Sequence, residues 1–220
     1  MSWYSTEDAR WFYDLFSGVR PYEEIYYRSY IALIGLGYTY DQTRDLLASL
    51  LKNGAKYANC EIVNENVFRC NNTYIEVATP PSSYCGDVTE VGFEFTWFHV
   101  FTCLNKIILN VLGQQIVFTR IFYGGEEKDG RRRLIVVELY IPKHKQSTRF
   151  LVFATPERLS LEFAEPEEAE IMERAGLTPH EVLSVFFRDE SAKATVEGGI
   201  RRIVNILPKV LLSVAVYFLY

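Results

Sequence analysis

Few residues of this chain have a type and spacing that could support catalysis. The candidates are one aspartate, one glutamate and two histidines: Asp129, Glu138, His99 and His180. Asp129 precedes a strand-like segment that carries Glu138, and sheet-based nucleases use paired carboxylates to hold Mg²⁺ beside a lysine. Here the residue two positions after Glu138 is Tyr140, and nine residues of strand would separate the two carboxylates by about 30 Å. The pattern favours a structural ion pair between Glu138 and Arg120, and it leaves a metal-dependent nuclease as an alternative.

Residues that could bind a metal also occur. His99 and Cys103 are one helical turn apart in the apolar segment 97–111, which we predict to be a helix. Zinc needs four ligands, so two would have to come from the other cysteines, and the chain has no Cys-x-x-Cys pair. We therefore expect no metal and no cofactor, and we interpret the cysteines as disulfides or buried thiols.

One disulfide follows from the expected strand pairing. Segments 60–63 and 67–70 form the pattern of a hairpin around a three-residue loop, which places Cys60 opposite Cys70. Facing cysteines at a non-hydrogen-bonded pair lie close enough to be joined. Cys85 and Cys103 are then the remaining pair.

The clearest structural pattern lies between Gln115 and Phe163. Runs rich in Val, Ile, Leu, Phe and Tyr alternate there with turn residues, which is typical of an antiparallel β-meander. The predicted strands are 115–123, 132–141, 149–154 and 158–163. Both faces of the first two strands are apolar, so helices or another sheet must cover both faces.

The first turn of the meander predicts a register. If residues 128–130 form a three-residue loop with Gly130 in the left-handed conformation, three pairs of opposite charges face each other. These pairs are Glu127 with Arg131, Glu126 with Arg132, and Arg120 with Glu138.

The N-terminal part has the pattern of three helices and a hairpin. Caps and apolar periodicity predict helices at 9–16, 21–36 and 41–51, ahead of the hairpin. This is the element order of a winged helix, in which the third helix would read DNA. The expected DNA contacts are the basic residues of this region: Arg44, Lys52, Lys56 and Arg69. Against this, residues 1–79 contain seven Lys or Arg and ten Asp or Glu, a net charge of −3, whereas phosphate binding requires positive charge.

A proline-containing segment, 80–91, is the predicted linker between the winged-helix-like domain (1–79) and a second domain (92–220). After the meander, caps predict helices at 166–175, 178–187 and 191–207. The expected fold class is therefore α+β, with a helical N-terminal part and small hairpin followed by an antiparallel β-meander packed by C-terminal helices.

Composition narrows the function further. Apolar residues make up 49% and charged residues 23% of the chain, which is the balance of a folded protein. The net charge of −5 argues against a broadly basic surface that coats nucleic acid. Scarce Gln, Met and His lean toward a thermophilic source, and intracellular proteins of hyperthermophiles can retain disulfides.

The chain ends give expectations about location. The N-terminal residues are acidic and lack the continuous apolar core of a signal peptide. The apolar run at 210–220 is too short to span a bilayer. We expect a cytoplasmic protein without a membrane partner.

Three functions remain after these exclusions. The leading hypothesis is a nucleic-acid-binding or regulatory protein that uses the winged-helix-like domain on DNA and the sheet domain for dimerisation or partner binding. The alternatives are a non-enzymatic assembly or protein-interaction protein and a metal-dependent nuclease. A basic stripe along the four expected DNA contacts would favour the first, and an exposed apolar patch that includes residues 210–220 would favour the second.

Overall fold

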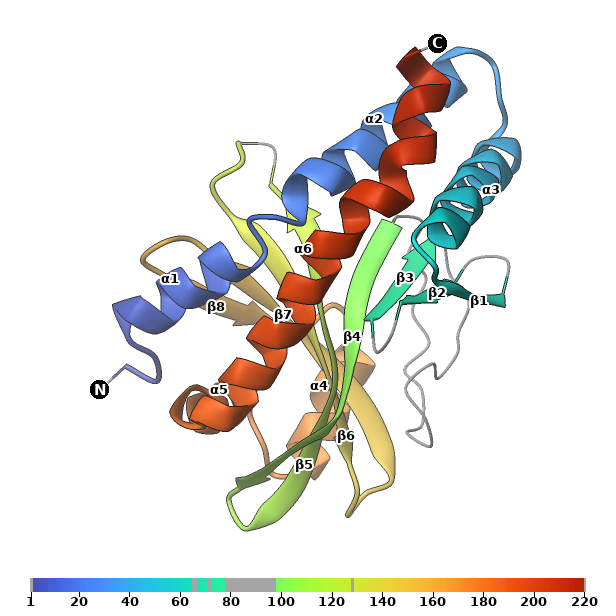
Figure 1. Ribbon diagram of the computed structural model, residues 1–220. Coiled ribbons are helices and arrows are strands. Elements are labelled where there is room, and N and C mark those ends of the chain that lie inside the picture. Colours follow the sequence, from blue (N-terminus) through green and yellow to red (C-terminus); the bar gives the residue numbers. More distant parts are fainter. Residues whose placement is uncertain (1, 65–66, 71–72, 78–97, 128, 220) are drawn as a thin grey trace.

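The computed structural model describes residues 2–64, 67–70, 73–77, 98–127 and 129–219 (Figure 1). The helices and strands in these ranges are, in chain order, α1 (Thr6–Leu15), α2 (Arg20–Gly35), α3 (Tyr40–Tyr57), β1 (Glu61–Asn64), β2 (Val67–Cys70), β3 (Thr73–Val77), β4 (Phe98–Val111), β5 (Gln114–Glu126), β6 (Arg133–Ile141), β7 (Gln146–Ala154), β8 (Leu159–Glu162), α4 (Pro166–Arg174), α5 (Pro179–Arg188) and α6 (Glu190–Leu219). This order confirms the predicted α+β fold class, because helices and a small hairpin precede an antiparallel meander and its C-terminal helices.

The described strands form one antiparallel sheet in the order β1-β2-β3-β4-β5-β6-β7-β8. The predicted helix at 97–111 is wrong, because this segment is strand β4. Along its second half the burial alternates, with buried residues at 107, 109 and 111 and exposed residues at 108 and 110. A period of two residues specifies a strand, and the uniformly apolar composition of the segment concealed it.

Strand β3 pairs with β4, so the sheet continues from the N-terminal part of the chain into the C-terminal part. The predicted linker at 80–91 lies outside the described residues. The division into domains 1–79 and 92–220 stays a prediction.

A glycine shifts the register between β5 and β6. Gly125 has a φ of +128°, a conformation that is open mainly to glycine, and the pairing slips by one residue just before it. The ion pairs at the turn are therefore Glu126–Arg133 and Glu127–Arg132, in place of the predicted Glu126–Arg132 and Glu127–Arg131.

The helix starts follow the expected capping chemistry, but the end of α3 does not. Ser5, Thr39 and Thr178 each open a capping box, in which the cap side chain and the residue three positions later bond each other's backbone N–H. Helix α3 runs six residues past its predicted end at position 51. A glycine shortly after a helix usually marks its end, whereas Gly54 lies inside α3 and faces α6.

The backbones of α3 and α6 meet at Gly54. A Cβ atom at this position would lie 1.8 Å from the carbonyl oxygen of Val210, so only glycine allows the approach. Helix α6 has 30 residues, about 45 Å at the rise of an α-helix. It lies across the sheet and continues beyond it beside α2 and α3 (Figure 1). The two parts of the chain are thus packed together along one helix.

Aromatic side chains fill the core between the sheet and the helices. Phe118 of β5 stacks on Phe186 of α5, with ring centroids 5.0 Å apart. Tyr123 of β5 stacks on Phe16, just after α1, at 6.0 Å. These contacts fix the N-terminal helix and α5 to the same face of the sheet.

Replacing Gly54 with alanine tests the contact between α3 and α6. The added methyl group separates the two helices, and overpacking of this kind costs about 1–3 kcal/mol or more. Gly198→Ala is the matched control, because nothing lies within 4 Å of a Cβ at that position of α6. Inside a helix, alanine stabilises the helical state by about 1 kcal/mol relative to glycine. Urea unfolding should show Gly54→Ala destabilised and Gly198→Ala unchanged or stabilised. Equal stability of Gly54→Ala and wild type would contradict the contact.

Candidate functional site

The carboxylate of Glu138 is held by two neighbours on strand β5. Arg120 Nε lies 3.1 Å from each carboxylate oxygen, and Arg120 Nη2 lies 2.6 Å from Oε2. Thr119 Oγ1 donates a hydrogen bond to Oε1 at 2.8 Å. The Arg120 and Glu138 side chains are 9% and 5% exposed. This geometry makes Glu138 a structural anion, because a buried carboxylate in a two-pronged ion pair is not free to act as a base or metal ligand.

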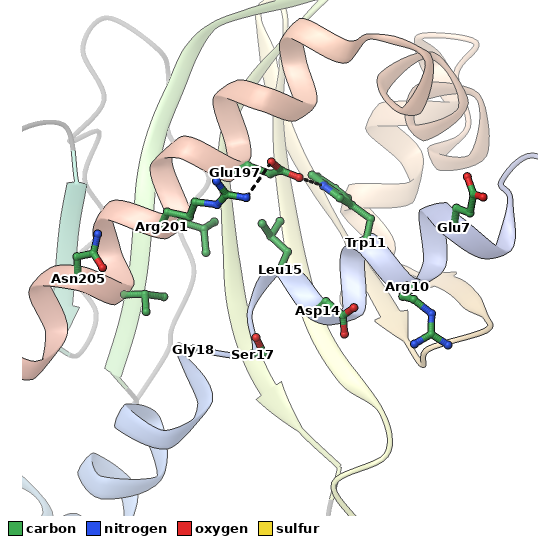
Figure 2. A pocket seen from close by; sticks show the side chains of 12 residues that line it. Glu7, Arg10, Trp11, Asp14, Leu15, Ser17, Gly18, Glu197, Arg201 and Asn205 are labelled. Atoms are coloured by element: carbon green, nitrogen blue, oxygen red, sulfur yellow. Dashed lines mark hydrogen bonds and ion pairs between the residues drawn. The ribbon is translucent and has the colours of Figure 1, made fainter.

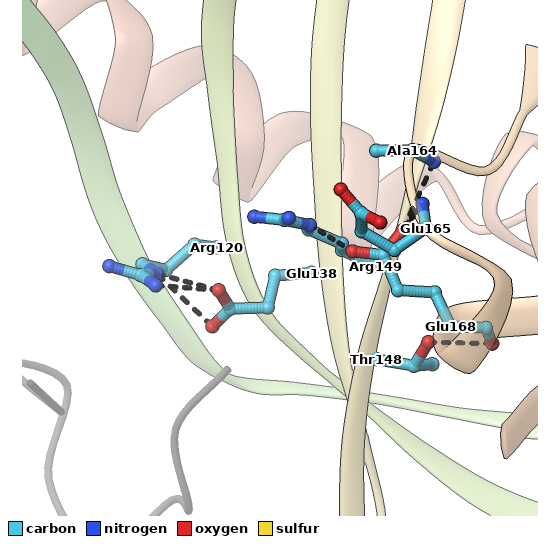
Figure 3. A network of polar contacts seen from close by, with 7 residues as sticks. All are labelled: Arg120, Glu138, Thr148, Arg149, Ala164, Glu165 and Glu168. Carbon is cyan, nitrogen blue, oxygen red and sulfur yellow. Dashed lines mark hydrogen bonds and ion pairs between the residues drawn. The ribbon is translucent and has the colours of Figure 1, made fainter. Parts of the chain in front are cut away.

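A second buried ion pair lies beside the first (Figure 3). Arg149 of β7 is opposite Glu138, and its Nε donates to Glu168 of α4. Glu168 Oε2 also accepts hydrogen bonds from the backbone N–H groups of Ala164 and Glu165, at 3.1 and 3.2 Å. Burial lowers the pKa of Arg149, and the nearby Glu168 opposes that shift. The network fastens α4 to the sheet.

The other candidate catalytic residues do not gather around Glu138. Asp129 is exposed in the β5–β6 turn and His180 is exposed on α5. His99 and Cys103 belong to strand β4, where four residues extend about 13 Å, so their spacing no longer suits a single metal ion. Within the described ranges, no three His, Cys, Asp or Glu side chains could hold a metal ion together.

Cys60 and Cys70 form a disulfide, with Cα atoms 4.6 Å apart. The bond closes the β1–β2 hairpin directly after α3, which gives it a structural role. Cys85 lies outside the described residues, so the disulfide between Cys85 and Cys103 stays a prediction.

Two of the four expected DNA contacts are engaged by carboxylates. Arg44 pairs with two aspartates of its own helix, at 2.9 and 4.0 Å, and Arg69 pairs with Glu61 on the facing strand. Lys52 is half-buried and Lys56 is exposed. The ion pairs reduce the positive charge available to phosphates, and nucleic-acid binding stays a prediction.

A hollow of about 660 Å³ lies between α1 and α6 (Figure 2). Trp11 Nε1 donates a hydrogen bond to Glu197, and Arg201 Nη2 lies 3.7 Å from the same carboxylate. Arg10 and Asp14 on its rim are exposed. Glu197 is held by Trp11 and Arg201, and the charges of Arg10 and Asp14 are exposed to solvent. These residues do not form an acid–base pair suited to catalysis.

A second hollow, of about 480 Å³, lies between α2 and the β5–β6 turn, and we name it the Glu23 pocket. Glu126 in its wall is neutralised twice, by Arg20 Nε at 2.5 Å and Arg133 Nε at 3.0 Å. Burial first, and then the charges of Glu126 and Glu24, raise the pKa of Glu23 to about 7. The lining comprises Arg20, Glu23, Glu24, Tyr27, Arg28, Tyr123, Gly124, Gly125, Glu126, Glu127 and Gly130.

A third hollow, of about 460 Å³, runs between α3 and α6, and we name it the α3–α6 groove. Leu212 and Val216 in its wall are 48% and 47% exposed. Near the C-terminal end of α6, a hydrogen bond with Tyr38 raises the pKa of Tyr217. The apolar C-terminal run is thus a helix with one open apolar side. The lining comprises Leu50, Asn53, Tyr57, Lys209, Leu212, Ser213, Val216 and Tyr217.

Sequence reasoning missed the Glu23 pocket and anticipated only one wall of the α3–α6 groove, the apolar run at 210–220. The walls of each come from segments about one hundred residues or more apart in the chain. No family model, curated protein or solved structure matches the chain, so no relative lends it a function. In the part of the chain that the structure describes, no helix has both the length and the hydrophobicity needed to cross a membrane.

Glu138→Gln tests the structural role of the buried ion pair. The amide removes the negative charge that faces the buried Arg120 guanidinium, and breaking a buried pair from one side costs about 3–5 kcal/mol. Glu127→Gln is the control, since its ion pair with Arg132 is 3.4 Å long and about half exposed, and such pairs contribute about 1 kcal/mol or less. Denaturant unfolding measures both. Similar losses for the two variants would contradict this role.

The raised pKa of Glu23 predicts a pH-dependent stability. Between its ordinary pKa of 4.5 and its folded value of about 7, the folded state binds a proton that the unfolded state has lost. Stability therefore falls as pH rises through this range, by up to about 3 kcal/mol. Glu23→Gln should match wild type below pH 4.5 and exceed it above pH 7, as measured by urea unfolding across pH. Parallel pH curves for wild type and Glu23→Gln would refute the shift.

Proposed function

We propose that this protein is a non-enzymatic assembly protein that forms a two-fold symmetric dimer through the α3–α6 groove. One observation carries the proposal. Of the fourteen large apolar side chains that are exposed in the described part of the chain, eleven lie on α2, α3, the loop between them or the last turns of α6. Four of these eleven line the groove, Tyr57, Leu212, Val216 and Tyr217, and exposed apolar side chains that share one surface mark an interaction site.

The shape of the surface favours a second copy as the occupant. Leu212 and Val216 are one turn apart on α6, so they form a ridge along one side of the groove. In a two-fold dimer the ridge of each copy fills the groove of the other. Such an interface needs only one patch per chain, because the same surface is used on both sides.

The charges along α3 are also complementary under two-fold symmetry. Helices α3 and α6 run antiparallel, since Gly54 contacts Val210 and the loop before α3 bonds the end of α6. Three lysines lie toward one end of the pair, Lys52, Lys56 and Lys209, whereas the other end carries two exposed aspartates, Asp41 and Asp45, and only one arginine between them, Arg44. When two grooves pack antiparallel, the basic end of one copy meets the acidic end of the other.

The two other functions have less support. Arg44 and Arg69, two of the expected DNA contacts, already face carboxylates. Glu138, the central candidate for a nuclease, is buried in its ion pair. Binding of duplex DNA that weakens steeply with salt would favour the nucleic-acid hypothesis over the assembly protein.

Light scattering and sedimentation across a range of protein concentrations test the dimer. Wild type should be dimeric, and Val216→Glu should raise the dissociation constant at least about a hundredfold, because it buries an unpaired charge. Ile108→Glu is the matched control, since Ile108 is 56% exposed on β4, away from the groove, and it should leave the dimer intact. A wild type that stays monomeric, alone or while bound to lipid vesicles or another protein, would overturn the proposal.

A charge exchange tests the geometry of the dimer. Lys209→Glu should weaken association, because it places like charges at the meeting ends of the two grooves. Adding Asp45→Lys to that variant should restore association, since the opposite charges face each other again. Failure of the second change to restore the dimer would contradict the antiparallel arrangement.

A further inference from the structure

The Glu23 pocket holds two polar groups whose hydrogen bonds are incomplete. Among the described residues, Glu23 forms no hydrogen bond or ion pair. Its Oε1 lies close to Gly125, at 3.4 Å from the position that a Cβ atom would take there. Tyr123 is 3% exposed, and its buried hydroxyl has no hydrogen-bond partner in the same part of the chain. Burial, and then the charges of Glu23 and Glu126, raise the pKa of this hydroxyl, and Tyr123 lines the same pocket as these two carboxylates.

The cations around the pocket are already engaged. Arg20 lies 2.5 Å from Glu126 and 3.2 Å from Glu24, and Arg133 lies 3.0 Å from Glu126. Glu23 is thus the carboxylate in the lining that no neighbouring arginine neutralises within the described residues. Glu23 is partly buried, and a carboxylate shielded from water without a partner is unfavourable unless it is protonated or receives a cation from outside.

We propose that the Glu23 pocket binds the primary ammonium group of an aliphatic amine, held by the Glu23 carboxylate and the Tyr123 hydroxyl. An ammonium group has three donors and no acceptor, so it can donate to the Glu23 carboxylate and to the Tyr123 hydroxyl oxygen at the same time. A volume of about 480 Å³ also accommodates a short alkyl chain. Tyr27 in the lining offers an aromatic surface to that chain.

A divalent metal ion fits this pocket less well. Calcium takes six to eight oxygen ligands, and no cluster of three or more suitable side chains exists among the described residues. The proposed site has one free carboxylate and one neutral hydroxyl. An organic cation needs no more than these.

Proton linkage follows from the surroundings of Glu23. The groups that face it are Arg20 and Glu24 on α2, Tyr123 and Glu126 on β5, and Arg133 behind Glu126 on β6. Because its pKa is raised to about 7, an ammonium ion that binds at lower pH must displace the proton. Affinity should therefore rise with pH up to about 7 and then level off.

Calorimetric titration of the full chain with n-butylamine tests the site. We expect saturable one-site binding at about pH 8 that weakens at least about tenfold at about pH 5.5, because the proton competes with the ammonium group. The neutral analogue n-butanol should not bind. No saturable binding of butylamine, or equal binding of butanol, would overturn the proposal and leave Glu23 as a protonated structural acid.

Three variants locate the binding. Glu23→Gln and Tyr123→Phe should each weaken butylamine binding at least about tenfold, since hydrogen bonds to charged groups contribute about 1.5–3 kcal/mol. Glu173→Gln is the matched control, because it removes the same charge from an exposed carboxylate of α4 that does not line the pocket, and it should keep the affinity within about twofold. Unchanged affinity in Glu23→Gln would refute the assignment. Misfolding would not explain a loss, because this variant should be the more stable protein above pH 7.

Discussion

The close approach of α3 to α6 at Gly54 and Val210 is the contact on which the rest of the arrangement depends. Helix α6 is long enough to cover the sheet with its first half and to leave it with its second half (Figure 1). The second half finds cover only because a glycine lets the backbone of α3 come against it. Leu50 and Tyr57, one turn of α3 before and after this glycine, line the α3–α6 groove. The same contact therefore joins the two parts of the chain and lies beside the apolar α3–α6 groove.

The carboxylates in and beside the core differ in whether an arginine neutralises them. Glu138, Glu168 and Glu126 each face an arginine, and the first two lie in a network that anchors α4 to the sheet (Figure 3). Their negative charge is balanced by these arginines, so the three carboxylates have a structural role. Glu23 differs, because the arginine nearest to it is shared by Glu126 and Glu24. A carboxylate with a raised pKa beside an unsatisfied hydroxyl is the arrangement expected of a binding site rather than of a scaffold.

The sequence predicted those features that depend on neighbours along the chain. Capping residues such as Thr39 and Thr178 marked helix starts, and turn glycines marked the meander. It failed where a distant contact decides the outcome. Gly54 has the pattern of a helix end and is instead a packing contact, and β4 has the composition of an apolar helix until its alternating burial is seen. The bulge at Gly125 moved two ion pairs by one residue. The Glu23 pocket joins segments about one hundred residues apart, which no local pattern connects.

An acidic chain that associates with itself must overcome its own net charge of −5. The α3–α6 groove offers a way to do so, because its lining contains no carboxylate and its one charged residue is Lys209. The acidic residues of α3 lie at the opposite end, where two-fold symmetry would bring them to the lysines of the second copy. Apolar area then supplies the attraction and the charge gradient along α3 sets the orientation. The buried acids Glu138 and Glu168 lie in ion pairs, whereas Glu23 lies in the pocket for which we propose a bound cation.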